Sequence, residues 1–329
     1  MMTITTTPAT GTANGSAPGI GGRPNRLRRS ELSTPATSEK MITKAAATDA
    51  DLVFLDLEDA VAPSEKEGAR ANIVAALRDL DWGSKVRAYR INGVHTPWCH
   101  GDLIEVVSGA GANLDVIIVP KVKRPRDVWF VDDLLTQLET GLGLEVGRIG
   151  LELLIEEAEA LADVEAIAAC SPRLEALILG VGDLAASQGI RTGHIGEGDA
   201  GELAYPGDMW HYHRNRMILA ARANGLDAID GPFANFRNPD AYRREATWAS
   251  TLGAVGKWCI HPSQIEIANE VYAPTAKEIE RARRVVEAVR EAEAAGAGSA
   301  NLNGVMIDAA TTRLFEVTLE RAAIAGLLD

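Results

Sequence analysis

The sequence has little cysteine and no long apolar run, and each scarcity excludes a class of protein. Its 329 residues include three cysteines, Cys99, Cys170 and Cys259, and no two of them form a C-x-x-C pair. An odd, widely spaced set argues against a disulfide framework and a structural zinc site. No segment approaches the roughly 18 apolar residues that a membrane-spanning helix needs. We therefore expect a soluble protein of the reducing cytoplasm without a membrane partner.

Basic residues are scarce outside the first thirty positions. Lys and Arg number 33 against 46 Asp and Glu, and the formal net charge is −13. Residues 1–30 contain no acid but hold Arg23, Arg26, Arg28 and Arg29, so the remainder carries 46 acids against 29 bases, or −17. We call these four arginines the basic strip. Because so acidic a body repels phosphate backbones, we expect no nucleic-acid partner.

The first 25 residues also lack helical periodicity and the apolar segment of a secretory signal. We therefore predict a disordered tail over residues 1–25. An acid-poor leader with arginines is also typical of a mitochondrial transit peptide, although its Gly and Pro residues oppose an amphipathic helix. With 46% hydrophobic residues overall, the chain has the composition of a packed globular fold.

From about residue 26, short apolar runs alternate with segments of helical periodicity. Eight runs have the composition of strands: LRRSEL (27–32), LVFLDL (52–57), VRAYRI (86–91), DVIIVP (115–120), IGLELLI (149–155), EALILGV (175–181), LDAIDG (226–231) and AVGKWCI (254–260). Near-continuous apolar strands that alternate with amphipathic helices are typical of a parallel sheet, and eight such units close a barrel. The sequence predicts an α/β fold, a (β/α)8 TIM barrel over residues 26–273. A doubly wound sheet is the alternative.

The chain continues beyond what a barrel needs. Residues 274–296 are highly charged with helical periodicity, residues 296–304 (GAGSANLNG) predict a break, and residues 306–322 predict a final helical segment. We expect residues 274–329 to form a C-terminal helical extension that packs on a neighbouring subunit.

Polar residues follow seven of the predicted strands at their carboxyl ends, where the active site of a TIM barrel lies. They are Asp56, Glu58, Asp59, Arg90, Asn92, Lys121, Glu156, Asp183 in the pair Gly182-Asp183, Asp230 and His261. Isolated charges beside apolar strands are costly to desolvate unless they are paired or bound to a metal. We therefore expect these side chains to share one polar pocket.

Carboxylates outnumber cations in this set, and a divalent cation is the simplest way to reconcile them. Glu156 and Asp183 follow neighbouring strands, and hard oxygen ligands without cysteine or paired histidine favour Mg²⁺ or Mn²⁺ over zinc. Such an ion would polarise a substrate carbonyl as a Lewis acid. The alternative is that each acid caps the helix that follows its strand.

The cationic candidates also have two interpretations each. Arg90 has the fork to bind a carboxylate or a developing enolate oxygen, or else it forms a salt bridge to Asp56 or Glu58. Lys121 belongs either to an anion site or to a solvated face. His211 and His213 are two residues apart on a predicted helix, so their rings point to different sides and we expect a structural role for both.

Seven motifs together resemble the HpcH/HpaI aldolase and citrate lyase beta-subunit-like family over about residues 26–326. They are LDLEDAVAP (55–63), YRING (89–93), IIVPKV (117–122), LLIEEA (153–158), GVGDLAAS (180–187), DGPF (230–233) and GKWCIHPSQ (256–264). Further motifs are similar to those of bacterial family members that cleave L-malyl-CoA and β-methylmalyl-CoA. These are LDWG (80–83), TPW (96–98), DVWFVD (127–132) and GDMWHY (207–212).

The resemblance implies a TIM barrel that binds Mg²⁺ through Glu156 and Asp183, with Arg90 on the glyoxylate or enolate oxygen. It implies an acyl-CoA thioester in contact with Lys40, Gly182, Asp183, Ile260 and His261. Asp308 matches a carboxylate that such lyases supply from an adjacent subunit as an acid/base group. The resemblance also implies a homotrimer or homohexamer.

The sequence departs from the family in two places. The usual P-G-x-R-P segment is PATS at residues 35–38, so the arginine that would touch the CoA phosphates is missing, and the basic strip is a candidate substitute. The usual E-T or E-S after the metal-binding glutamate is Glu156-Glu157, which adds a charge beside the site.

The leading hypothesis is a Mg²⁺-dependent, reversible Claisen-type cleavage of (3S)-malyl-CoA or β-methylmalyl-CoA to glyoxylate and acetyl-CoA or propionyl-CoA. A malyl-CoA thioesterase and a citramalyl-CoA lyase are alternative enzymes for the same pocket. From another class, the chain could be a non-catalytic acyl-CoA binder or a subunit of a lyase complex.

Overall fold

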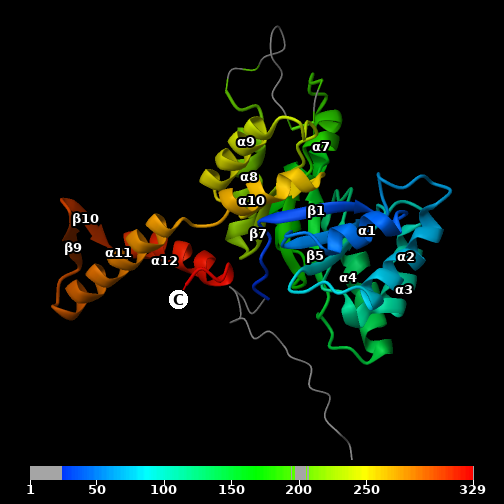
Figure 1. Cartoon of the computed structure of the whole chain (residues 1–329), viewed down its shortest axis with the longest axis horizontal. Helices are drawn as coiled ribbons and strands as arrows, with labels where there is room; N and C mark the ends of the chain where they lie inside the picture. Colours follow the sequence, from blue (N-terminus) through cyan, green and yellow to red (C-terminus); the bar gives the residue numbers. More distant parts are fainter. Residues whose placement is uncertain (1–23, 194, 197–204, 206, 329) are drawn as a thin grey trace, which may run out of the picture.

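The computed structural model describes residues 24–193, 195–196, 205 and 207–328. Its centre is a closed barrel of eight parallel strands that follow one another in sequence order, with β8 pairing back to β1 (Figure 1). The strands are β1 (Ser30–Pro35), β2 (Leu52–Asp56), β3 (Val86–Arg90), β4 (Val116–Val119), β5 (Gly150–Ile155), β6 (Leu174–Leu179), β7 (Asp227–Asp230) and β8 (Gly256–Cys259). The closed barrel confirms the predicted TIM barrel, and the alternative prediction of a doubly wound sheet is wrong.

Helices surround the barrel. They are α1 (Glu39–Ala46), α2 (Lys66–Asp79), α3 (Cys99–Ala110), α4 (Pro125–Leu142), α5 (Ala158–Ala162), α6 (Val164–Ala168), α7 (Val181–Gln188), α8 (His211–Ala223), α9 (Pro239–Leu252) and α10 (Ile265–Val271). Residues 156–170, whose pattern indicates one helical segment, form the two short helices α5 and α6 instead. Asp163 lies between them in a non-helical conformation.

The strands are buried on both faces, which explains their near-continuous apolar sequences. Inside the barrel, Phe54, Ile118, Ile178 and Ile229 belong to one apolar cluster. A larger apolar cluster, which includes Leu55, lies between the outer faces of the strands and the helices. All five of these side chains are fully buried. This packing fixes the strands, and with them the polar residues at their ends.

The first strand begins three residues later than its sequence pattern indicates. Arg28 and Arg29 precede β1 and form ion pairs to Glu152 at 2.6 Å and to Asp51 at 2.8 Å. Their side chains therefore hold the N-terminal end of the barrel closed. Of the tail predicted over residues 1–25, residues 1–23 lie outside the described part of the chain.

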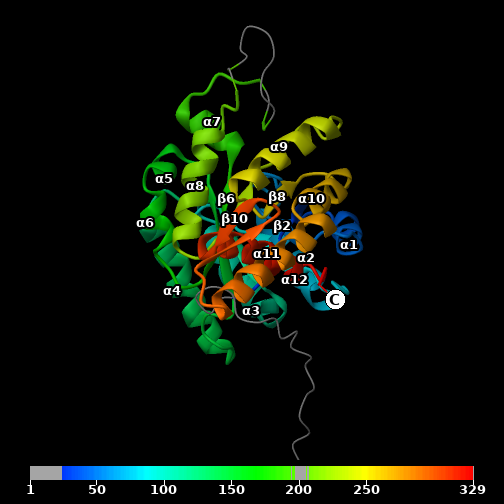
Figure 2. The same cartoon turned by 90° about the vertical axis from the view of Figure 1, so that its left-hand side faces the viewer.

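The C-terminal extension is a helix, a hairpin and a second helix. It consists of α11 (Ala276–Ala294), β9 (Ser299–Leu302), β10 (Val305–Asp308) and α12 (Ala309–Ile324). Figures 1 and 2 show α11 leading away from the barrel, the hairpin at its far end and α12 returning toward the barrel. Among the described residues, no helix is long and apolar enough to cross a membrane.

The hairpin corrects the sequence interpretation, which places a break at 296–304 and assigns residues 306–308 to the last helix. Asn303 and Gly304 connect the two strands with φ angles of 56° and 83°. Asn-Gly is the dipeptide that a two-residue hairpin turn of type I′ favours, because both positions need a positive φ. The hairpin signal was therefore present in the sequence.

Candidate active site

Arg90 lies at the carboxyl end of β3 and is held by the end of β2 and the loop that follows it. Its Nε donates to Asp56 Oδ1 at 2.7 Å, and its Nη2 donates to Asp56 Oδ2 at 2.6 Å. Its Nη1 lies 2.9 Å from Glu58 Oε2. The salt bridge that the sequence left as an alternative for Arg90 is thus present.

The charge of Arg90 is fixed by these partners. Burial alone would lower its pKa, but the Asp56 and Glu58 carboxylates raise it above its usual value. The guanidinium carbon also lies 5.4 Å from the ring centre of Trp258 on β8. Arg90 is therefore a permanently charged, oriented group at the barrel mouth, suited to an anionic oxygen.

A second cluster gathers Lys121, Glu156 and Asp183 from three consecutive βα junctions. Lys121 Nζ lies 2.6 Å from Asp183 Oδ1 and 3.8 Å from both Glu156 Oε2 and Glu58 Oε1. The Lys121 backbone N–H also donates to Glu156 Oε1 at 2.7 Å. Lys121 adopts a φ of 54°, a conformation that is uncommon outside glycine and that accompanies this bond. The structure thus brings Glu156 and Asp183 together, as the sequence predicts.

Burial sets the protonation of the two glutamates. Glu156 is 2% exposed, and burial raises its pKa to about 8 even though Lys121 opposes the shift. Burial also raises the pKa of Glu58 to about 7, against the charge of Arg90. Glu58 Oε2 is buried beside Arg90 Nη1, at 2.9 Å, although the two atoms make no well-aligned hydrogen bond. Burial thus outweighs the cations beside these two glutamates and favours their protonated forms.

The cluster fits a hard divalent cation. Glu156 Oε2 and Asp183 Oδ1 both face one point, the Lys121 ammonium, and carboxylate oxygens are the donors that Mg²⁺ takes together with water. Within the described part of the chain, no three or more Asp, Glu, His or Cys side chains gather as a closed metal cage. The protein would thus contribute two carboxylates and leave the other positions to water or substrate.

The neighbouring glycines make room for this arrangement. A Cβ atom at Gly180 would lie 2.3 Å from Glu156 Cβ, so any larger residue there would displace the glutamate. Gly182 lies in the first turn of α7, beside Asp183, whose side chain is 45% exposed. Gly182 was predicted as a site residue and Gly180 was not, although the motif GVGDLAAS contains both.

Three predicted substrate residues lie on the rim of the barrel mouth. Lys40 is exposed in the first turn of α1, directly after β1, and Ile260 and His261 follow β8. The N–H groups of Ile260 and His261 donate to Gln264 Oε1 at 2.8 and 3.3 Å. Gln264, which sequence reasoning missed, therefore orients this segment and leaves its carbonyl groups for other contacts.

Asp308 is not part of this mouth within one chain. It is the last residue of β10 at the far end of the extension (Figure 1), where it caps α12 by accepting from Thr311 N at 3.0 Å. These hydrogen bonds lower its pKa, so Asp308 is ionised at neutral pH. Within one chain, Asp308 therefore lies apart from the mouth of the barrel.

A buried ion network beneath β7 and β8 was also missed. Lys257 Nζ lies 2.5 Å from Asp230 Oδ2, and Arg214 Nε donates to Asp230 Oδ1 at 2.9 Å. These two cations lower the pKa of Asp230 to about 2 despite its burial. Asp230 is fully engaged in this network, which fixes the DGPF segment. Of the two histidines on α8, His213 is buried against Gln188 and His211 is exposed, as expected.

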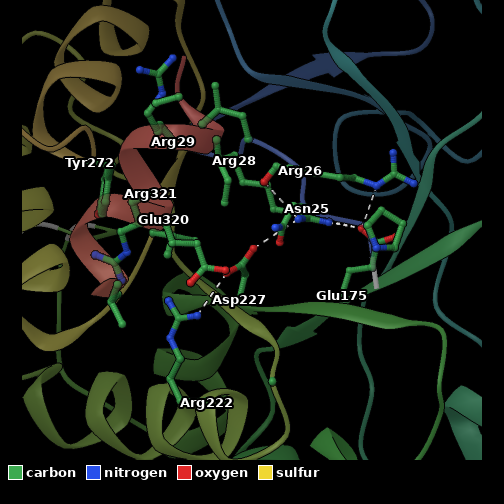
Figure 3. Close-up of a pocket in the computed structure, with 17 residues that line it drawn as sticks. Asn25, Arg26, Arg28, Arg29, Glu175, Arg222, Asp227, Tyr272, Glu320 and Arg321 are labelled. Carbon is green, nitrogen blue, oxygen red and sulfur yellow. Dashed lines mark hydrogen bonds and ion pairs between the residues drawn. The ribbon is translucent and has the colours of Figure 1, made fainter. Parts of the chain in front are cut away.

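The basic strip contradicts one expectation. Arg26, Arg28 and Arg29 lie before β1, at the N-terminal end of the barrel, and pair with Glu175, Glu152 and Asp51. They cannot replace the missing CoA-binding arginine, because the carboxyl ends of the strands are at the opposite end. Figure 3 shows these arginines at a cavity between the barrel and α12.

A closed barrel with an oriented arginine, a lysine and several carboxylates at its strand ends defines a TIM-barrel enzyme. Residues 29–262 match the family HpcH/HpaI aldolase/citrate lyase, and residues 206–327 match a C-C bond lyase of the TIM-barrel fold. The chain belongs to the HpcH/HpaI aldolase/citrate lyase family.

Three relatives cover most of the chain. An L-malyl-CoA/beta-methylmalyl-CoA lyase of Rhodobacter capsulatus is 40% identical over 309 residues, 92% of this chain and 96% of that protein. A malyl-CoA/beta-methylmalyl-CoA/citramalyl-CoA lyase of Chloroflexus aurantiacus is 34% identical over 86% of this chain and 84% of its own length. The crystal structure of protein CitE from Mycobacterium tuberculosis, in complex with magnesium, acetoacetate and coenzyme A, is 28% identical. It has a TM-score of 0.69 and covers 89% of this chain and 97% of that chain.

Proposed function

We propose that the protein is a carbon-carbon lyase that reversibly cleaves (3S)-malyl-CoA or β-methylmalyl-CoA to glyoxylate and acetyl-CoA or propionyl-CoA. The observation that carries the proposal is the 40% identity to a lyase of that name over nearly the full length of both chains. The convergence of Glu156 and Asp183 on one point supports it independently.

Glu156 and Asp183 would hold Mg²⁺, and the CitE structure with magnesium supports this choice over Mn²⁺. The bound ion supplies a Lewis acid for the oxygen that becomes the glyoxylate carbonyl. Lys121 holds the two carboxylates near each other, through its ammonium at Asp183 and its backbone N–H at Glu156. It forms no covalent bond to substrate in this scheme.

Arg90 would bind the alkoxide oxygen of the substrate as the bond between C2 and C3 of malyl-CoA breaks. A base takes the β-hydroxyl proton, the bonding electrons pass to the thioester as an enolate, and glyoxylate leaves. Asp308 of a neighbouring subunit returns a proton to the enolate carbon. In the condensation direction Asp308 takes that proton, and its lowered pKa keeps it in the ionised form that a base needs while weakening it as a base.

The test is cleavage of malyl-CoA, β-methylmalyl-CoA and citramalyl-CoA with Mg²⁺, with glyoxylate, pyruvate and free CoA measured separately. Glu156→Gln should lower glyoxylate release by about 10³-fold, because it removes a metal ligand and its charge. Glu157→Gln is the matched control, since Glu157 is the adjacent acid and points to Ser187 instead. Full activity of Glu156→Gln would overturn the metal assignment.

The name of the Chloroflexus relative favours a second substrate, citramalyl-CoA, whose cleavage gives pyruvate. Pyruvate release without glyoxylate would assign that activity instead. Free CoA without either oxoacid would indicate hydrolysis by a thioesterase. Tight thioester binding without any product would indicate an acyl-CoA binder or a complex subunit.

We further propose the substrate contacts and the assembly. Lys40, Gly182, Ile260 and His261 lie at or near the barrel mouth and would contact the CoA thioester. The position of Asp308 at the end of β10, in the extension, supports an oligomer in which residues 274–329 complete a neighbour's site, and we propose a homotrimer or homohexamer. The three free cysteines support a cytoplasmic location.

A further inference from the structure

A cavity of about 240 Å³ lies at the N-terminal end of the barrel, where the proposed lyase reaction has no use for it. Figure 3 shows Arg321 and Glu320 of α12 on one side, with Arg222 and Asp227 of the barrel layer on the other. Arg222 lies in the last turn of α8, and Asp227 begins β7. The cavity is therefore separate from the carboxylates at the carboxyl ends of the strands.

One stripe of α12 faces the cavity. Its members are spaced three, one, three and one residues apart and so lie on one side of the helix: Val317, Glu320, Arg321, Ile324 and Ala325. The barrel contributes Leu27 and Val255 to the same wall. The cavity thus combines an apolar surface with the head groups of Arg222 and Arg321.

The two arginines differ in their partners. Arg222 Nη1 lies 3.2 Å from Asp227 Oδ1, and its Nη2 donates to the Gly253 carbonyl at 2.9 Å. Arg321 reaches that carbonyl at 3.4 Å and, among the described residues, has no carboxylate within 4.0 Å. Burial and the nearby charge of Arg222 lower the pKa of Arg321. Asp227 and Glu320, which also line the cavity, oppose this shift without cancelling it, so positive charge is only partly compensated in a partly enclosed space.

The chemistry of the lining defines a ligand class. A planar guanidinium binds a carboxylate through two parallel N–H bonds. A ligand carboxylate would therefore compensate the positive charge of Arg222 and Arg321 that Asp227 does not neutralise. Leu27, Val255 and Ile324 offer an apolar wall that a bare inorganic anion cannot use. The volume suits a molecule of a few carbon atoms.

We propose that this cavity binds a small aliphatic monocarboxylate, with its carboxylate on Arg321 and Arg222 and its hydrocarbon part against Leu27, Val255 and Ile324. The ligand joins α12 to the barrel, because it touches both. Its binding therefore favours the position of the helix whose first residue follows Asp308.

The experiment titrates the full-length protein with butyrate by calorimetry. Arg321→Gln should weaken butyrate binding at least tenfold while lyase activity stays unchanged, and Arg321→Lys should fall between the two. Arg283→Gln, which removes an exposed arginine of α11, is the matched control and should bind as the wild type does. Arg90→Lys should also keep butyrate binding, which separates this cavity from the mouth of the barrel.

Two further ligands test the two parts of the proposed contact. Butyramide keeps the hydrocarbon part of butyrate but lacks its charge, and inorganic phosphate carries charge but has no hydrocarbon part. Both should bind more weakly than butyrate. Hydrogen exchange of α12 should slow with butyrate in the wild type and not in Arg321→Gln. If Arg321→Gln does not fold, Ala325→Leu, which fills the cavity, should abolish binding instead. Equal butyrate affinity in wild type and Arg321→Gln, no butyrate binding, or equal affinity for phosphate would overturn the proposal.

Discussion

Arg90 meets Asp56 through two parallel N–H bonds, and this geometry limits what any replacement can do. The pair is buried, with Asp56 1% and Arg90 5% exposed, so the fork is held in one plane by a partner that water does not screen. A lysine keeps the charge but offers a point donor in place of the fork.

Arg90→Lys should therefore lower kcat/KM for malyl-CoA cleavage by about 10²–10³-fold, because the oriented donor at the reacting oxygen is lost. It should also lower the free energy of unfolding by about 1–3 kcal/mol, because a buried carboxylate loses part of its hydrogen bonding. Steady-state kinetics and urea unfolding measure the two effects. Arg87→Lys is a control on the same strand, paired instead with Asp115 at 2.9 Å, and it should leave kcat/KM within a few-fold. Wild-type kinetics in Arg90→Lys would remove Arg90 from the reaction.

At the scale of elements, α8 and α9 are joined to β7 and β8 by buried charges. Glu245 on α9 accepts from Arg214 Nη2 at 3.0 Å and lies 4.0 Å from Lys257 Nζ. Burial raises the pKa of Glu245 to about 7, above its ordinary value of 4.5, in spite of these cations. The folded chain therefore keeps a proton on Glu245 over a pH range in which the unfolded chain releases it.

This pKa predicts the sign of a pH effect. Between about pH 4.5 and 7 the unfolded state binds fewer protons at Glu245 than the folded state does, so the stabilising contribution of this group falls as pH rises. Glu245→Gln cannot titrate and should gain stability relative to the wild type from pH 5 to pH 8. Thermal unfolding of both proteins across this range measures the difference. A Tm difference that is constant with pH would contradict the assignment.

Asp308 caps α12, and this structural role can be separated by mutation from its proposed role in proton transfer. Asn caps helices as well as Asp does, whereas Ala does not. Asp308→Asn should therefore keep the wild-type Tm and lose exchange of the acyl-CoA α-proton with solvent, while Asp308→Ala should lower the Tm as well. NMR of acetyl-CoA in deuterium oxide with glyoxylate absent follows the exchange. Normal exchange in Asp308→Asn would leave Asp308 with a capping role alone.

The same elements show how far sequence reasoning reached. Period and composition predict the barrel, because parallel strands that are buried on both faces favour near-continuous apolar runs, as in β2 and β4. The convergence of Glu156 and Asp183 follows from the fold alone. The partners of Arg28 or Arg214 do not, since they depend on side chains that are distant in the sequence, such as Glu152 and Glu245.

At the scale of the whole molecule, the mouth of the barrel and Asp308 lie apart, and an active site that uses both requires two chains (Figure 1). Mixing equal amounts of Glu156→Gln and Asp308→Asn subunits should restore about one quarter of wild-type activity in a symmetric oligomer. An intact site needs Glu156 from an Asp308→Asn subunit and Asp308 from a neighbouring Glu156→Gln subunit, and each of these positions is filled correctly in about half of the cases. Subunits exchanged by mild unfolding and refolding provide the test. Activity no higher than that of the separate variants would show that both residues act within one chain or that Asp308 has no part in catalysis.

The helix α11 has a consequence for how this protein tolerates change in length. Its 19 residues carry the hairpin and Asp308 away from the barrel as a rigid spacer. One inserted residue would lengthen the spacer by about 1.5 Å and rotate everything beyond it by about 100°. Substitutions on the exposed face of α11 leave this spacing unchanged, but a single insertion or deletion would turn Asp308 away from the neighbouring site that we propose it completes.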